Sequence, residues 1–170
     1  MKLHNPEQIG YLQYLCNRFG DFKVSRAWHD KDGVLFWSKH RSVMECWHSE
    51  DGIRWLGFVN NREILLCEIV FDIDINATPE NMNKLCDMLE SLGMKYKAYS
   101  TGSKGYHIHC FDPDLLQFQR TKYKQIILSL FNCDILKASD HTMIALENAP
   151  HWKTGIKKTL LRQYPHEQTN

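Results

Sequence analysis

The clearest alternation of apolar and polar positions runs through ILLCEIVFDIDI, from Ile64 to Ile75. Because successive side chains of a strand point to opposite faces, this pattern predicts a strand with one apolar face and one acidic face. The apolar face would carry Leu65, Cys67, Ile69, Phe71, Ile73 and Ile75, and the other face Glu68, Val70, Asp72 and Asp74. Asp72 and Asp74 would lie roughly 6.6 Å apart, near enough to repel each other unless a cation lies between them. An amphipathic strand with a solvated face is the simpler interpretation of the segment alone.

Helical spacing of apolar residues predicts three helices. The first runs from the capping pattern Asn5-Pro6 to Gly20. The second begins at Thr78-Pro79 and ends at Gly93, with an apolar stripe of Met82, Leu85, Cys86, Leu89 and Leu92. The third follows Pro113, and its buried side would carry Tyr123, Ile126, Ile127, Leu130 and Phe131.

Short β-rich segments surround these helices. The stretch from Phe22 to Phe58 is rich in aromatic and turn residues and predicts short strands or hairpins. KYKAYS and YHIHCF predict two strands joined by TGSKG, and further short runs lie near Asp134 and between Met143 and Leu146. The order of elements predicts an α+β fold with a mostly antiparallel sheet flanked by helices. We expect one domain over 1–170, in which 1–60 form a helix and a β-rich part and 61–165 carry the motifs.

Composition narrows the class of protein. Six scattered cysteines form no CxxC pair, and with no secretory leader they predict buried free thiols in a reducing compartment. No apolar run reaches the 18 or so residues of a membrane span, so we expect an intracellular, cytoplasmic protein without a membrane partner. The formal charge of +1 neither favours nor excludes nucleic acid, because only local clusters of charge decide that question.

The turn TGSKG is a candidate anion site. Gly102 and Gly105 allow positive φ angles, so backbone N–H groups can converge on an anion with Lys104 beside them. His107 and His109 would then share one strand face. A plain glycine hairpin is the simpler interpretation of the turn alone. An acidic pair beside an anion-binding turn, however, supplies the two halves of a nucleoside triphosphate site.

The third candidate segment runs from Cys133 to Gly155. Asp134 follows an apolar helix and is expected to begin a strand, which makes it a better ligand candidate than Asp140 in its polar stretch. His151-Trp152-Lys153-Thr154-Gly155 is a polar loop, and Lys157, Lys158 and Arg162 follow it without an acid. This segment predicts either a phosphate-binding basic patch or a solvated surface run.

The ordered set FDID, STGSKGYHIH, CDI and HWKTG resembles the catalytic small subunit of archaeo-eukaryotic DNA primases. That family carries a hydrophobic-DxD motif, an S-G-x-x-G-x-H motif, a third hydrophobic-D motif and a downstream S-x-H-x-K-T-G segment. The resemblance covers roughly Glu63 to Leu161. It implies a primase-polymerase core of RRM-like type in a minimal form, because the zinc-binding insertion of many members is missing.

The resemblance implies a two-metal nucleotidyltransferase. The catalytic, metal-binding carboxylates would be Asp72, Asp74 and Asp134, and the nucleotide-binding residues Thr101, Ser103, Lys104, His107, His151 and Lys153. One departure concerns Ala145, where the family tends to place a basic residue. The cofactors would be two Mg²⁺ or Mn²⁺ ions, because oxygen ligands favour these over zinc.

The implied reaction is template-directed synthesis of an RNA or DNA primer from NTPs or dNTPs. Single-stranded DNA would be the template, along a groove that we expect to be lined by Trp and Arg residues between Arg26 and Arg62. A helicase or a large primase subunit would be a further partner. Three alternatives stay open: a non-catalytic nucleic-acid-binding subunit, a gap-filling repair polymerase, and a hydrolase or oxygenase whose metal is held by His107 and His109.

Overall fold

The computed structural model describes residues 5–112, 120–139 and 141–165. Pro113 and Asp140, which entered the sequence interpretation, therefore lie outside the described residues. Contacts divide the chain into two compact units. The first unit comprises Met1–Glu63 and Met143–Lys158, and the second comprises Ile64–Thr142 and Thr159–Asn170.

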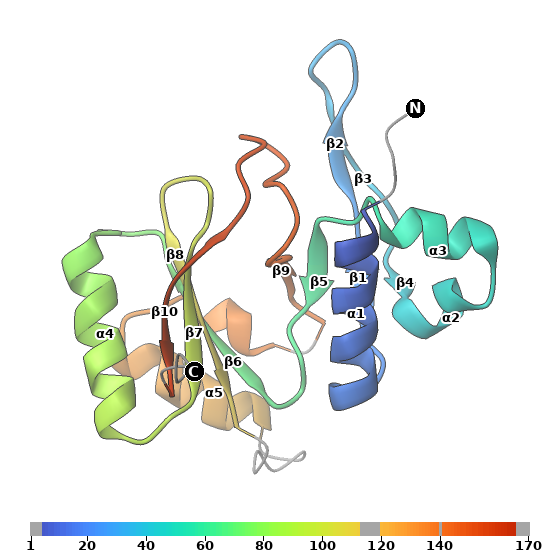
Figure 1. The fold of residues 1–170 in the computed structure, drawn as a ribbon. Coiled ribbons are helices and arrows are strands. Elements are labelled where there is room, and N and C mark those ends of the chain that lie inside the picture. The colour runs from blue at the N-terminus through green and yellow to red at the C-terminus, as the bar shows by residue number, and fades with distance from the viewer. Residues whose placement is uncertain (1–4, 113–119, 140, 166–170) are drawn as a thin grey trace, which may run out of the picture. The chain divides into compact units, whose positions relative to one another are not determined.

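The second unit is built on a four-stranded antiparallel sheet of order β10-β7-β8-β6 (Figure 1). Its strands are β6 (Glu68–Ile73), β7 (Tyr96–Ser100), β8 (Tyr106–Phe111) and β10 (Thr159–Tyr164). The hairpin predicted from KYKAYS and YHIHCF is confirmed as the pair β7–β8. In the β6–β8 pair, Asp72 lies opposite His107 and Phe71 lies opposite Ile108. The α+β prediction is thereby confirmed in this unit.

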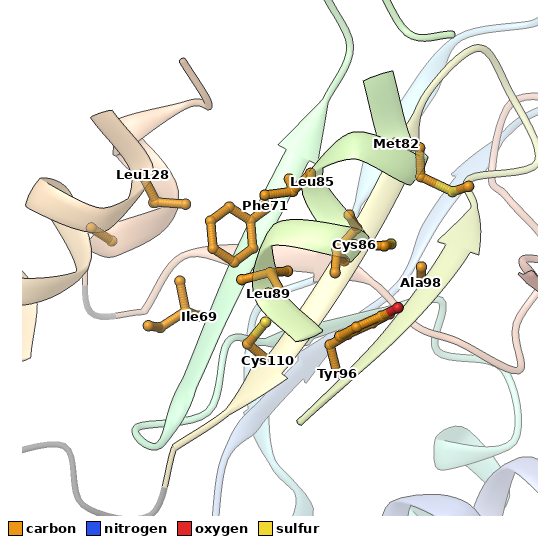
Figure 2. Close-up of a cluster of buried hydrophobic side chains, with 12 residues drawn as sticks. Ile69, Phe71, Met82, Leu85, Cys86, Leu89, Tyr96, Ala98, Cys110 and Leu128 are labelled. Atoms are coloured by element: carbon orange, nitrogen blue, oxygen red, sulfur yellow. The ribbon is translucent and has the colours of Figure 1, made fainter. Parts of the chain in front are cut away.

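Helices α4 (Pro79–Ser91) and α5 (Arg120–Leu130) and the 3₁₀ helix η1 (Ile135–Ala138) supply the remaining elements. Figure 2 shows side chains of α4 and α5 packed with those of the strands in one apolar cluster. The cluster consists of Ile69, Phe71, Met82, Leu85, Cys86, Leu89, Tyr96, Ala98, Ile108, Cys110, Leu128 and Ala138. The core face predicted for the acidic strand is therefore correct at Ile69 and Phe71.

The strand itself ends earlier than its alternation predicts. β6 stops at Ile73, and Ile75 in the following turn is exposed. Asn76 in that turn has a φ of 53°, which breaks the extended pattern. Ile75 is therefore not on the core face, and Asp74 follows the strand instead of belonging to it.

Two predicted helix stripes need correction. α4 is capped by Thr78 and buries the first four stripe residues as predicted, but Leu92 is exposed because the helix ends at Ser91. In α5 the side chains of Tyr123, Ile126 and Leu130 are exposed. Ile127 and Phe131 are half-buried and pack against the apolar cluster, as predicted, and the buried side of the helix also carries Lys124 and Leu128. The aliphatic stem of a lysine can be buried while its ammonium binds a carbonyl, which an apolar count does not register.

The first unit contains a second antiparallel sheet of order β4-β1-β5-β9 and a separate two-stranded hairpin β2–β3. The sheet strands are β1 (Lys23–Ser25), β4 (Arg41–Ser42), β5 (Asn61–Glu63) and β9 (Met143–Ala145). The hairpin strands are β2 (Ala27–His29) and β3 (Leu35–Trp37). α1 (Pro6–Phe19) begins at its N-cap Asn5 and ends at Gly20, as predicted.

Part of the predicted β-rich stretch is helical. α2 (Val43–Trp47) and α3 (Glu50–Leu56) occupy part of the stretch that was expected to form short strands or hairpins. Ser42 and Ser49 cap these helices by accepting the backbone N–H groups of Glu45 and Gly52. The serine-to-glutamate spacing of a capping box at Ser42 was the available signal for α2. Position 52 also has no room for a side chain, because a Cβ there would overlap the backbone carbonyl of Cys46.

The cysteines are free, as predicted; three are buried, and Cys16, Cys67 and Cys133 are half-buried. Among the described residues, no helix is long and apolar enough to cross a membrane.

Replacing Leu89 with alanine should lower the free energy of unfolding by about 2–5 kcal/mol, because its buried side chain leaves a cavity in the cluster of Figure 2. Urea denaturation measures this loss. Leu92→Ala is the matched control from the same predicted stripe, and its exposed side chain should change stability by less than about 0.5 kcal/mol. Equal losses of unfolding free energy in both variants would contradict the end of α4 at Ser91 and the exposure of Leu92.

Candidate functional site

Three predicted carboxylates line one cavity of the second unit. Asp72 lies on β6, Asp74 directly follows this strand, and Asp134 lies between α5 and η1. The cavity has a volume of about 810 Å³. Its other walls come from the turn after β6, from α4 and from the segment Leu130–Asp134. Residues more than 60 positions apart in the sequence therefore meet around one space.

Asp72 is the most constrained of the three. Its side chain is only 10% exposed, and its two oxygens contact different basic side chains: Oδ1 lies 3.3 Å from His107 Nε2, and Oδ2 lies 3.2 Å from Lys137 Nζ. Burial alone would raise the pKa of Asp72, but His107 and Lys137 outweigh it and lower the pKa to about 2. Asp72 is therefore charged at any physiological pH.

The cavity carries a negative potential. Burial and the nearby charges of Asp72 and Asp134 raise the pKa of Asp74, although Lys137 opposes the shift. The thiol of Cys133 lines the same cavity, and burial together with Asp72 and Asp134 raises its pKa to about 11. The charges of Asp72 and Asp134 therefore add to burial in disfavouring further negative charge in this space.

Asp134 does not begin a strand as expected. It is the N-cap of η1, and its Oδ1 accepts the backbone N–H of Leu136 at 2.9 Å. The same short helix places Lys137 against Asp72. This short helix and its N-cap therefore bring both a carboxylate and a counter-charge to the cavity.

The glycine turn lies directly against the acidic pair. A Cβ at position 105 would overlap the carboxylate of Asp74 and lie 2.7 Å from the carbonyl oxygen of Ile73. Gly102 has a φ of 74°, as predicted, but Gly105 does not have a positive φ. Gly105 is needed for close approach and not for its backbone angle. The two motifs expected to form halves of one site are neighbours in space.

The hydroxyl of Thr101 shapes this turn. Its Oγ1 accepts the backbone N–H groups of Ser103 at 3.3 Å and of Gly105 at 3.2 Å, and Thr101 itself is buried. Two N–H groups that were expected to face an anion are thus directed to Thr101. The exposed side chains of Ser103 and Lys104 are the parts of the turn that remain accessible to a phosphate.

The two histidines of β8 have separate carboxylate partners. His107 faces Asp72, whereas Nδ1 of the buried His109 lies 2.6 Å from Oε1 of Glu68. Glu68 was expected on a solvated acidic face, yet it is fully buried. Within the described residues, no set of three ligand atoms that includes both histidines converges within 4.8 Å. This arrangement does not favour an H-x-H metal site.

His151 and Lys153 belong to the first unit, so the structure does not join them to the carboxylate cavity. His151 organises its own loop: its Nδ1 accepts the backbone N–H groups of Lys153 at 3.3 Å and Thr154 at 3.4 Å. Burial and the charges of Lys153 and Lys158 lower the pKa of His151, so its ring is neutral at pH 7. Lys153 is exposed.

The predicted basic segment is divided between the units. Arg162 lies on β10, and its guanidinium contacts Asp87 and Glu90 of α4 at 2.7 and 2.8 Å. It is therefore not part of a free basic patch. At Ala145, strand β9 faces Asn61 of β5. The neighbouring Arg62 is fully buried and pairs with Glu147 within the first unit.

The residues present fit a divalent cation. Asp72, Asp74 and Asp134 offer hard oxygen ligands around a negative cavity, and Oδ1 of Asp72 makes no hydrogen bond although it is buried. The oxygens of these three residues, all in the described part of the chain, do not yet lie within 4.8 Å of one another. Side-chain rotation would have to complete a coordination shell. Lys137 was missed from the sequence because its contact with Asp72 joins separate segments, although a lysine three residues after Asp134 was visible.

Gly105→Ala should displace Asp74 and destabilise the protein by about 1–3 kcal/mol, because the new methyl group overlaps a carboxylate and a backbone carbonyl. Urea denaturation and Mn²⁺ binding by isothermal calorimetry measure the two effects. Gly10→Ala is the control: no heavy atom lies within 4 Å of its Cβ, and in a helix it should be neutral or stabilising. Unchanged stability and Mn²⁺ affinity in Gly105→Ala would contradict the close approach.

Lys137→Met should raise the pKa of Asp72 by about 1, because the variant removes the ammonium group beside a buried carboxylate. The pKa of Asp72 in the folded protein is below its unfolded value of about 3.9. Its stabilisation is therefore present above about pH 4 and is lost as the pH falls towards 2. The variant should lose less stability over that range, as measured by acid titration of the free energy of unfolding and by carboxylate NMR.

Lys84→Met serves as the control for this titration. Lys84 also lines the cavity, but its ammonium pairs with the exposed Glu80 at 2.7 Å. If both variants changed the Asp72 pKa equally, the shift would come from the overall positive charge near the cavity and not from the direct contact with Lys137.

Comparisons with known proteins give the fold of the chain. Its structure is similar to the polymerase domain of Mycobacterium tuberculosis ligase D, solved in complex with DNA, with a TM-score of 0.61 and 12% sequence identity. The similarity covers 95% of this chain and 88% of that domain. No protein-family model matches the sequence, and no curated protein matches it. The chain thus shares the α+β fold of that polymerase domain.

Proposed function

We propose that this chain is a primase-polymerase that joins NTPs or dNTPs on a single-stranded DNA template. One observation carries the proposal: Asp72, Asp74 and Asp134, predicted as metal ligands, line one negative cavity with the glycine turn against Asp74. The fold shared with a DNA-bound polymerase domain supports it.

In this proposal the three carboxylates hold two Mg²⁺ or Mn²⁺ ions. When bound, such ions activate the attacking hydroxyl and neutralise charge that develops on the phosphates. His107 and Lys137 keep Asp72 ionised and fix the direction of its oxygens. In this proposal His107 orients the carboxylate of Asp72. The resemblance to the primase family instead implied that His107 binds the triphosphate.

The exposed Ser103 and Lys104 side chains are the proposed contacts to the β and γ phosphates, and Thr101 holds the turn in shape. His151 and Lys153 remain proposed nucleotide ligands from the first unit. In the reaction the 3′-hydroxyl oxygen bonds to the α-phosphorus and the α–β phosphoanhydride bond breaks. The hydroxyl proton passes to water, and pyrophosphate leaves.

Gap filling is the second candidate. The solved domain with this fold belongs to a ligase, which favours extension of an existing strand over the start of a new one. A helicase or a large primase subunit remains a proposed partner of the priming activity only.

The test is synthesis on a single-stranded template with Mg²⁺ or Mn²⁺ and labelled NTPs or dNTPs, with and without a primer. Asp134→Asn is the sharpest variant, because asparagine keeps the cap of η1 while it removes the charge. We expect at least about a 100-fold loss of product. Asp51→Asn, which changes an exposed acid of α3 in the other unit, should retain full activity.

Products without a primer establish a primase, and products only with a primer establish a gap-filling polymerase. Full turnover by Asp134→Asn would contradict its role as a ligand. Absence of product under every condition would favour the non-catalytic, nucleic-acid-binding subunit.

A further inference from the structure

The β2–β3 hairpin of the first unit exposes large apolar side chains. Its two strands pair only with each other within the described residues. Trp28, Val34, Phe36 and Trp37 are 36%, 53%, 43% and 53% exposed. Such a concentration on a two-stranded hairpin contributes little to a core and marks a binding surface.

The register divides these aromatic rings between two faces. Trp28 lies opposite Phe36, and their rings stack with centroids 5.8 Å apart. Trp37 lies opposite Ala27, so with His29 it occupies the other face. On this second face, a separate segment of the same unit packs against the hairpin.

That segment is the loop organised by His151. The Trp152 ring lies 5.5 Å from that of His29 and 5.9 Å from that of Trp37, and it stacks on His151 at 5.6 Å. We call His29, Trp37, His151 and Trp152 the aromatic platform. It presents several flat rings, at least one of which is more than half exposed.

Lysine and arginine residues follow the platform residues Trp37 and Trp152 in the sequence, whereas Asp30 and Asp32 follow His29. No acidic residue occurs from Gly33 to Met44 or from Asn148 to Lys158. These stretches contain the cations Lys39, Arg41, Lys153 and Lys157, all of them exposed. Asp30, at the other end of the hairpin turn, accepts the backbone N–H groups of Asp32 and Val34. Positive charge beside stacked rings fits an anionic ligand with flat apolar groups.

We infer that the aromatic platform binds single-stranded nucleic acid by base stacking. Stacking on exposed aromatic side chains combined with nearby lysines and arginines is the way in which proteins hold single strands without sequence preference. Duplex DNA has its bases already stacked, so the platform should discriminate against it. The inference rests on the proposed function only in naming the template as the natural ligand.

The test is fluorescence anisotropy with a labelled oligothymidine of about 12 nucleotides, without metal or nucleotide. Trp37→Leu keeps an apolar side chain but removes the ring, and it should weaken binding about tenfold. Trp37→Phe should restore most of the affinity. Tyr14→Ala, an exposed aromatic of α1 outside the platform, should bind normally.

Equal affinity of Trp37→Leu and the unchanged protein would overturn the inference, and so would tighter binding of a duplex of the same length. Loss of self-association in Trp37→Leu with unchanged oligonucleotide binding would instead assign the surface to a second copy of the chain. Asp134→Asn should bind the oligonucleotide normally. Loss of synthesis by Asp134→Asn and loss of oligonucleotide binding by Trp37→Leu are therefore separate outcomes, so the proposed function and the proposed binding surface can fail independently.

Discussion

The buried charge of Asp72 is the interaction on which the carboxylate cavity depends. A carboxylate that is nine-tenths buried stays ionised only if nearby basic or hydrogen-bonding groups offset the lost hydration. Lys137 and His107 supply that compensation from η1 and from the neighbouring strand. Without them, burial would favour the neutral acid, and the cavity would lose its most firmly held negative group.

The same site needs a position without a side chain. Asp74 lies where a Cβ at Gly105 would be, so the turn and the end of β6 can approach only because residue 105 is glycine. The apolar cluster formed with α4 and α5 fixes β6 and β8 at this distance. Packing on the strands therefore sets the geometry of the polar groups at their ends.

The first unit uses charge differently. Its buried pair Arg62–Glu147 links β5 to the turn after β9, so these two charges serve the fold. The accessible lysines and rings lie instead on the hairpin and on the His151 loop. Buried charge for structure and exposed charge beside aromatic rings for ligands are thus separated within one unit.

The sequence by itself determined the local features: the caps of α1 and α4, the apolar face at Ile69 and Phe71, the β7–β8 hairpin, and the candidate carboxylates. These follow from periodicity and capping, which act over a few residues. It did not determine α2 and α3, the end of β6 before Ile75, or the buried side of α5, because long-range packing overrides weak local preferences. Only the tertiary structure placed Lys137 against Asp72, Gly105 against Asp74 and Trp152 beside Trp37, because each contact joins segments whose separation along the chain carries no periodic signal.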